Sequence, residues 1–150
     1  MQLKTDIARW ETIRGGLALA LDRFRDDDLE FVPFEGSWVV GRIALHIASA
    51  EEGWFRHVVT GELEEWPADM TLERYPTVEA IKGILAKVHE RTVEFLRDLD
   101  DAALARSITS PWGNELSLGW IIWHVLEHEI HHRGELSLIL GMLGREGLGA

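Results

Sequence analysis

The stretch from His128 to Glu135, HEIHHRGE, contains the side chains best suited to metal chemistry in this sequence. Within it, His128, Glu129 and His132 satisfy the H-E-x-x-H pattern of zinc metalloproteases. There, two histidines one helical turn apart bind zinc and the glutamate acts as general base. A protease of this kind also needs a third zinc ligand beyond the motif, so the residues that follow decide the interpretation.

No suitable third ligand follows the motif. Glu135 stands where the extended protease motif has a glycine, and no histidine follows His132. Of the later glutamates, Glu135 belongs to the same predicted helix and Glu146 lies in a glycine-rich tail. The sequence also shows no sheet that could lie above an active-site helix. We therefore interpret the H-E-x-x-H match as a coincidence.

Helical geometry separates the four histidines of this segment. At about 100° per residue from His124, His128 lies near 40°, His132 near 80° and His131 near −20°. The aliphatic residues of the segment centre near 110°, so His128 and His132 face the interior while His124 and His131 lie on its flank. Imidazoles four residues apart can converge on one ion.

His46 is the predicted third ligand, because it lies at the edge of an apolar stripe on a second helix. Three histidines with an open fourth position form a site that can activate water or polarise a substrate. Imidazole binds zinc, nickel, copper and iron, which leaves the metal open. His57 and His89 are interpreted as surface or partly buried residues without a special role.

Glu129 falls near 140°, inside the apolar stripe, which is unusual for a carboxylate. Two interpretations stay open. In the first, the flexible side chain carries the carboxylate out of the edge of the core to solvent; in the second, the carboxylate acts beside the metal as a general base or as a partner that orients a histidine. His124 is the second candidate catalytic residue, as a partner that orients a metal ligand or as a residue at the site mouth; the alternative is a flank or interface position.

Four segments with helical periodicity must position these residues. They run from about Thr5 to Phe24, from Ser37 as N-cap to Gly61, from Thr77 to about Leu99, and from Ser117 to just before Gly144. No segment alternates with a period of two between turn signals, so no sheet is expected. Four long amphipathic helices in 150 residues predict a single all-α domain, 1–150, built as a four-helix bundle.

Composition narrows the class of protein. There is no cysteine, which excludes thiolate ligands and a cysteine nucleophile. A net charge of −11 argues against a nucleic-acid partner. No secretory signal is visible and no apolar run approaches the ~18 residues that span a membrane, so we expect a cytoplasmic protein without a membrane partner.

Two segments together resemble the DinB/YfiT-like superfamily. They are GSWVVGRIALHIASAEEGWF, with a tryptophan eight residues before the histidine, and SLGWIIWHVLEHEIHHRGELSLILGMLG, with its H-x3-H-R-G-[QE] pattern. The resemblance implies an up-and-down-type four-helix bundle with a divalent metal, zinc or nickel first, held by His46, His128 and His132. Glu135 stands where glutamine is common in that family, and Gly141 where arginine is common.

The resemblance also suggests activities and partners. Some members resemble S-transferases or maleylpyruvate isomerases that use a low-molecular-weight thiol such as bacillithiol or mycothiol, and members are often homodimers. Our first hypothesis is therefore a metal-dependent thiol S-transferase acting on a small-molecule substrate, with Arg133 and Arg42 meeting the carboxylates of the thiol. A metal-dependent hydrolase is the second hypothesis, and a metal-binding stress protein without turnover is the third.

Overall fold

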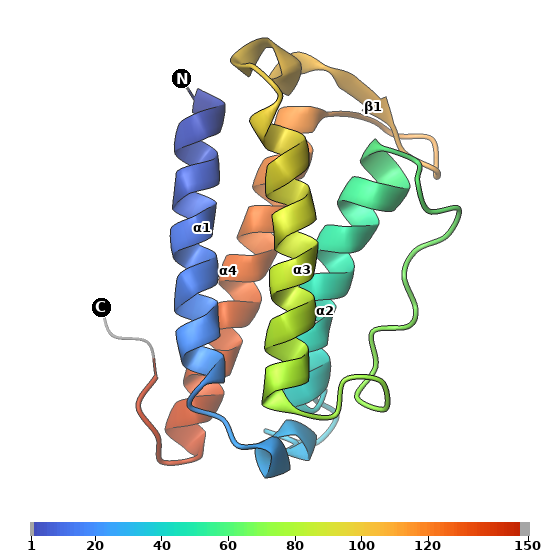
Figure 1. Cartoon of the computed structure of the whole chain (residues 1–150). Helices are drawn as coiled ribbons and strands as arrows, with labels where there is room; N and C mark the ends of the chain where they lie inside the picture. The colour runs from blue at the N-terminus through green and yellow to red at the C-terminus, as the bar shows by residue number, and fades with distance from the viewer. Residues whose placement is uncertain (1, 148–150) are drawn as a thin grey trace.

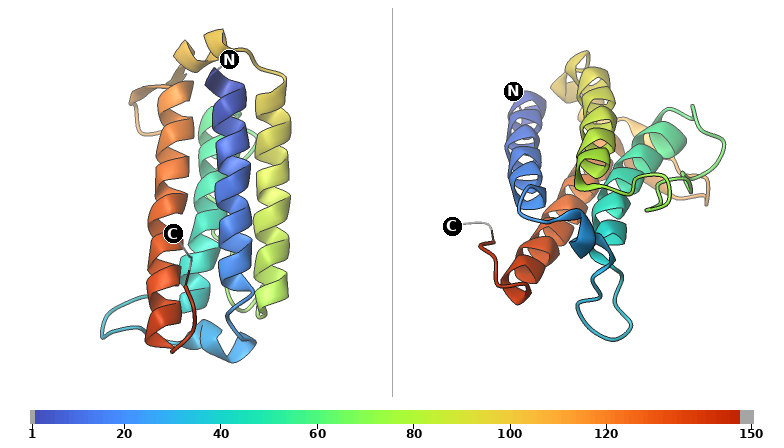
Figure 2. Two further views of the ribbon diagram at one scale, coloured as in Figure 1. Left: turned by 90° about the vertical axis from the view of Figure 1, so that its left-hand side faces the viewer. Right: turned by 60° about the horizontal axis from the view of Figure 1, so that its bottom comes forward.

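The computed structural model describes residues 2–147, which form a bundle of four long helices aligned along one axis (Figures 1 and 2). Between them lie short helices and one small hairpin, so the all-α prediction is confirmed for the main architecture. In chain order the elements are α1 (Gln2–Leu21), η1 (Asp26–Glu30), α2 (Val40–Glu52), the π-helical η2 (Gly53–Val59), α3 (Val78–Arg97), η3 (Asp101–Ala105), β1 (Ser107–Thr109), β2 (Glu115–Ser117) and α4 (Leu118–Met142).

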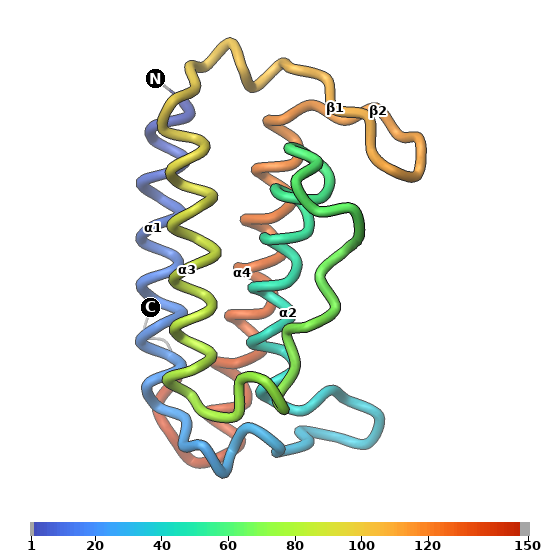
Figure 3. The backbone as a smooth tube through the Cα atoms, turned by 45° about the vertical axis from the view of Figure 1, so that its right-hand side comes forward, coloured from blue at the N-terminus to red at the C-terminus, as the bar shows by residue number. Residues whose placement is uncertain are grey.

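The order of helix directions differs from the expected up-and-down arrangement. In Figure 1, α1 descends, α2 and α3 both ascend, and α4 descends. The parallel pair requires a long return, which residues 60–77 supply by running outside α2 back to its starting end (Figure 3). This connection explains why the sequence carries a long proline-bearing segment at this point.

Helix starts were predicted best where a hydroxyl caps them. Thr77 caps α3 by accepting a hydrogen bond from the Ala80 amide, and Ser117 caps α4 by accepting one from the Trp120 amide. The predicted cap at Ser37 is wrong, because α2 begins after Val39. The Ser37 amide instead closes a turn onto the Phe34 carbonyl, where Gly36 adopts a φ of 86°.

The second helix changes type before Gly61. From Gly53 its turns widen to π-helix, at the point where the Trp66 ring packs so closely that a Cβ on Gly53 would lie 2.4 Å from it.

The expectation of no sheet is also wrong. Strands β1 and β2 pair antiparallel around a turn in which Gly113 has a φ of 92°. Three residues per strand are too few for alternation to appear in the sequence.

The core consists of two apolar clusters separated by a layer of buried polar side chains. One cluster includes Leu17, Leu21, Ile43, Ile47, Ile81, Leu85, Leu136 and Leu140, and the other includes Leu3, Ile7, Trp10, Phe55, Leu96, Leu118, Ile121 and Val125. Between them along the four helices lie Arg14, Glu51, His89 and Glu129, all buried. The core is therefore apolar at both ends and charged in its middle.

Within residues 2–147, none of the helices combines the length and the apolar character that a membrane crossing would need.

Candidate metal centre

Three histidines from α2 and α4 meet at one point, as the sequence predicted. The Nε2 atom of His128 lies 2.9 Å from Nε2 of His46 and 3.1 Å from Nε2 of His132. All three side chains are partly buried, and one ring nitrogen from each lies within 4.8 Å of the other two. Helices α2 and α4 pack directly against each other, which brings positions far apart in the sequence together.

The pKa values of two of the three rings, His46 and His128, suit a cation. Burial, followed by the neighbouring rings of His132 and His46, lowers the pKa of His128 to about 3. Burial also lowers the pKa of His46, with His132 and Arg42 as further causes. Both imidazoles are therefore neutral near pH 7, which is the form that binds a metal.

Hydrogen bonding gives a second reason why the donor set fits a metal. Nδ1 of His132 lies 2.8 Å from Oε2 of Glu135, and an ionised carboxylate only accepts, so the proton of this ring lies on Nδ1. In the neutral form of this ring, Nε2 would be a lone-pair acceptor facing His128. A single Nε2 proton on His128 can satisfy His132 or His46 but not both. A divalent cation would satisfy all three lone pairs at once.

Glu135 is the site residue to which sequence reasoning gave no role. Its carboxylate oxygen Oε2 accepts from Nδ1 of His132, and its other oxygen, Oε1, lies 3.0 Å from Nε2 of His131. Partners of this kind fix the ring orientation of a metal-binding histidine and raise its basicity. The available signal was its spacing of three residues from His132 on the same helix. His131 itself is exposed, on the flank that its helical angle predicts.

A groove opens beside the histidines. It has a volume of about 360 Å³ and lies between residues 33–38 and the C-terminal half of α4, with His132 and Glu135 in its lining. The Trp38 ring packs edge-on against His46 at 5.0 Å, and the Arg42 guanidinium lies 4.2 Å from the centre of the Trp38 ring. Arg42, one of the two predicted cations, is therefore close to the triad formed by His46, His128 and His132.

The other predicted cation, Arg133, lies elsewhere. Its Nη1 reaches towards the Ile13 carbonyl on α1 at 3.5 Å and packs against Gly16, and the residue is not part of the groove lining. The alternative for Arg133 is an ordinary surface ion pair; its contact in this structure is with a backbone carbonyl, and a role in binding a thiol carboxylate stays a prediction. On the helix, Arg133 is about 100° beyond His132 and meets α1.

His124 lies in a cluster of aromatic rings. Its ring stacks on Trp120 at 4.7 Å with an interplanar angle of 8°, and Trp54 contacts it edge-on at 5.1 Å. It precedes His128 by one helical turn but does not belong to the group of converging donors. A catalytic role for His124 stays a prediction.

Glu129 does not leave the core edge, since only 1% of it is exposed. Its carboxylate accepts hydrogen bonds from Trp10 Nε1 at 2.7 Å, from Arg14 Nε at 2.9 Å and from Arg14 Nη2 at 2.8 Å. These partners occupy both oxygens, and they come from α1 rather than from the triad. The carboxylate thus serves the core network in this structure, and the site residue that orients a histidine is Glu135.

The same network corrects the interpretation of His89. This ring is buried, and its Nδ1 donates to Glu51 at 2.9 Å while Arg14 Nη2 binds the other Glu51 oxygen at 2.5 Å. Burial alone would raise the pKa of Glu51, but Arg14, followed by His89 and Thr92, outweighs it and lowers that pKa. One guanidinium therefore connects carboxylates of α2 and α4.

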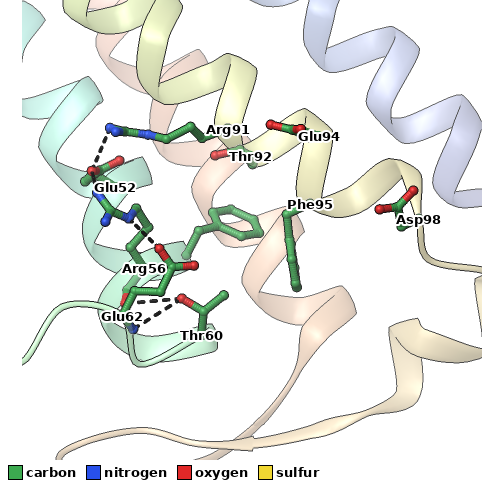
Figure 4. Close-up of a pocket in the computed structure, with 10 residues that line it drawn as sticks. Glu52, Arg56, Thr60, Glu62, Arg91, Thr92, Glu94, Phe95 and Asp98 are labelled. Carbon is green, nitrogen blue, oxygen red and sulfur yellow. Dashed lines mark hydrogen bonds and ion pairs between the residues drawn. The ribbon is translucent and has the colours of Figure 1, made fainter.

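A second pocket, of about 310 Å³, lies between the end of α2 with η2 and the end of α3 (Figure 4). Its side chains are largely committed to each other. Glu52 accepts from both Arg56 and Arg91 at 2.7 Å, and Arg56 also binds Glu62. Within residues 2–147, the groups of converging metal donors are the triad and His131, His132 and Glu135. The candidate metal centre is therefore the triad.

Comparison with known proteins agrees with this geometry. The sequence profile of the DinB superfamily matches residues 9–136. The protein YjoA of Bacillus subtilis is 26% identical over 130 residues, which cover 85% of this chain and 81% of YjoA.

Two solved structures share the fold. YfiT from Bacillus subtilis is described as "a probable metal-dependent hydrolase with an unusual four-helix bundle topology". It superposes with a TM-score of 0.68 at 23% identity, over 93% of this chain and 88% of YfiT. A mycothiol-dependent maleylpyruvate isomerase matches 88% of this chain with a TM-score of 0.53 at 18% identity, and 60% of the isomerase is covered.

Proposed function

The chain belongs to the DinB superfamily, and from that premise we propose that it is a divalent-metal-dependent enzyme whose ion is held by His46, His128 and His132. The observation that carries the proposal is the convergence of three imidazole nitrogens beside an open groove. Three protein ligands with a free position are typical of catalytic rather than structural zinc sites. Zinc and nickel are the ions we expect first.

Hydrolysis is the reaction that we place first. When bound, a divalent ion supplies a Lewis acid that lowers the pKa of water and polarises a carbonyl or phosphoryl oxygen. Glu135 contributes by holding the proton of His132 on Nδ1, which keeps Nε2 available. The description of YfiT as a probable metal-dependent hydrolase supports the same class.

Thiol S-transfer is the second candidate. Arg42 is a cation beside the triad, where it could meet a carboxylate of a low-molecular-weight thiol, and the maleylpyruvate isomerase shares the fold. We rank this candidate below hydrolysis because Arg133, the other expected cation, bonds towards α1. A single arginine provides a weaker anchor for a cofactor that carries several carboxylates.

Metal content tests the proposal. Untagged protein would be analysed for bound metal beside His46→Ala, His128→Ala and His132→Ala, with His131→Ala as the matched control on the same helix. We expect about one ion per chain in the parent and in the control, and a strong loss in each of the three variants. Full retention in all three would overturn the proposal.

Activity then separates the two reactions. The metal-loaded protein would be incubated with a panel of esters and amides, and separately with bacillithiol or mycothiol and an electrophile. Metal-dependent hydrolysis without conjugation supports the hydrolase. Conjugation that requires both metal and thiol, without hydrolysis, would reverse the ranking.

A further inference from the structure

The groove beside the triad has an apolar wall that the metal site itself does not require. Its lining includes Phe34, Trp38, Ile43, Leu138, Ile139 and Met142. Among these, Phe34 and Leu138 are each 69% exposed and Met142 is 51% exposed. Large apolar side chains gathered around one hollow and open to water usually mark a binding site.

One end of this groove is polar, and that end is the metal site. His132 and Glu135 belong to the lining, and His132 is one of the three converging imidazoles. Arg42 is not part of the lining, but its guanidinium lies over the Trp38 ring, which lines the groove and packs edge-on against His46. The groove therefore runs from a place that would hold a metal and a positive charge towards a purely apolar wall on the last turns of α4.

The volume indicates the size of the occupant. About 360 Å³ falls within the range of small-molecule sites, roughly 300–1,000 Å³. A second copy of the chain seated on this wall would cover the access to His132, the histidine that lines the groove. A small molecule lying along the groove would instead contact both the metal site at one end of the groove and the apolar wall at the other.

We propose that the groove between residues 33–38 and the last turns of α4 binds the apolar body of an amphipathic small-molecule substrate, whose anionic, metal-ligating head reaches the triad. This inference rests on the proposed function and specifies its substrate class. The apolar wall supplies affinity that grows with the length of the substrate chain, while the triad and Arg42 bind the head. Leu138 is a specificity-determining residue in this assignment because it touches only the apolar body.

The test uses alkyl hydroxamates, which carry one metal-ligating head on chains of different length. Zinc-loaded protein would be titrated by calorimetry with acetohydroxamate, butanohydroxamate, hexanohydroxamate and octanohydroxamate. We expect affinity to rise about fourfold for each methylene that the groove buries. Leu138→Asn should lower the affinity for octanohydroxamate about tenfold and leave that for acetohydroxamate unchanged. The matched control is Leu19→Asn, an exposed leucine on α1 that should change neither affinity.

The outcomes distinguish this inference from the proposed function. If the protein retains no zinc, the proposed function fails first, and the inference fails with it. If zinc binds and acetohydroxamate binds equally well as octanohydroxamate, the metal site stands and the groove assignment is overturned. It is also overturned if affinity does not depend on chain length and Leu138→Asn converts a dimer into a monomer by light scattering, because the wall would then be covered by a second copy.

Discussion

Replacement of Arg14 by methionine should destabilise this protein more than most single substitutions. The Arg14 side chain is buried and makes four hydrogen bonds, two to Glu129, one to Glu51 and one to the Leu85 carbonyl. Glu51 and Glu129 are 0% and 1% exposed. Methionine would fill much of the same space, yet it would leave two carboxylates buried without their cation.

Removing one partner of a buried ion pair costs about 3–5 kcal/mol, chiefly because the remaining charge loses its compensation. Since whole domains are stable by about 5–15 kcal/mol, Arg14→Met should lose a large part of the free energy of unfolding. The deficit should shrink on acidification. In the parent the pKa of Glu51 is lowered, so the parent loses stability as pH falls towards that pKa. Without Arg14, only His89 and Thr92 oppose the burial that raises this pKa, so the variant should lose less stability on acidification than the parent.

Urea unfolding followed by tryptophan fluorescence at pH 7 measures this loss from the midpoint at unchanged slope. Arg9→Met, an exposed arginine on the same helix, is the matched control and should change stability by less than ~0.5 kcal/mol. The triple variant Arg14→Met, Glu51→Gln, Glu129→Gln should recover part of the loss because it buries no charge. A loss below ~1 kcal/mol in Arg14→Met, or no recovery in the triple variant, would refute the charge argument.

Three further changes test other parts of the structure. Thr77→Ala removes the side-chain cap of α3 and should cost about 1 kcal/mol by urea unfolding, whereas Thr71→Ala in the preceding loop should cost less. Glu135→Gln keeps the shape but removes the charge that holds His132 Nδ1–H, so metal affinity measured by chelator competition should fall about 10- to 100-fold. Burial and neighbouring imidazoles lower the pKa of His128 to about 3, so between pH 6.5 and 3 the unfolded chain binds the extra proton and metal-free protein loses stability as pH falls. His128→Gln should therefore lose less stability than the parent between pH 7 and pH 4.5, and an equal loss would contradict the shift.

The helices and two of their starting points could be predicted because their causes are local, whereas the predicted cap at Ser37 is wrong. Periodicity and a hydroxyl before the first turn define α3 and α4 to within a few residues. The parallel direction of α2 and α3 could not be predicted, since either order buries the same apolar faces. Only the length of the connection at 60–77 indicates a return along the bundle.

The triad could be predicted in two steps of different kinds. Helical angles alone select His128 and His132, while His46 needed its position on an apolar stripe and is also implied by the family resemblance. The partners of Glu129 were missed, although Arg14 also lies within the apolar stripe of its helix, between Trp10 and Leu17. A charged residue in the apolar stripe of a helix is costly to bury alone. When the apolar stripes of different helices carry opposite charges, this can indicate that the charges pair with each other in the core.

The network and the metal site are linked through two helices, which leads to a last prediction. His128 and Glu129 are consecutive on α4 and point about 100° apart, so the position of Glu129 fixes the rotation that presents His128 to His46. The Nη2 atom of Arg14 binds both Glu129 on α4 and Glu51 on α2, the helix that carries His46. Loss of these two ion pairs should let the two helices rotate and translate relative to each other.

We therefore expect Arg14→Met to lower metal affinity by on the order of tenfold, although Arg14 is not a metal ligand. Removal of a residue that positions a metal ligand has an effect of this size. Chelator competition, done where the variant is still folded, measures the effect, with Arg9→Met as control. Unchanged affinity in a destabilised Arg14→Met protein would show that α2 and α4 hold the triad by their apolar contacts alone.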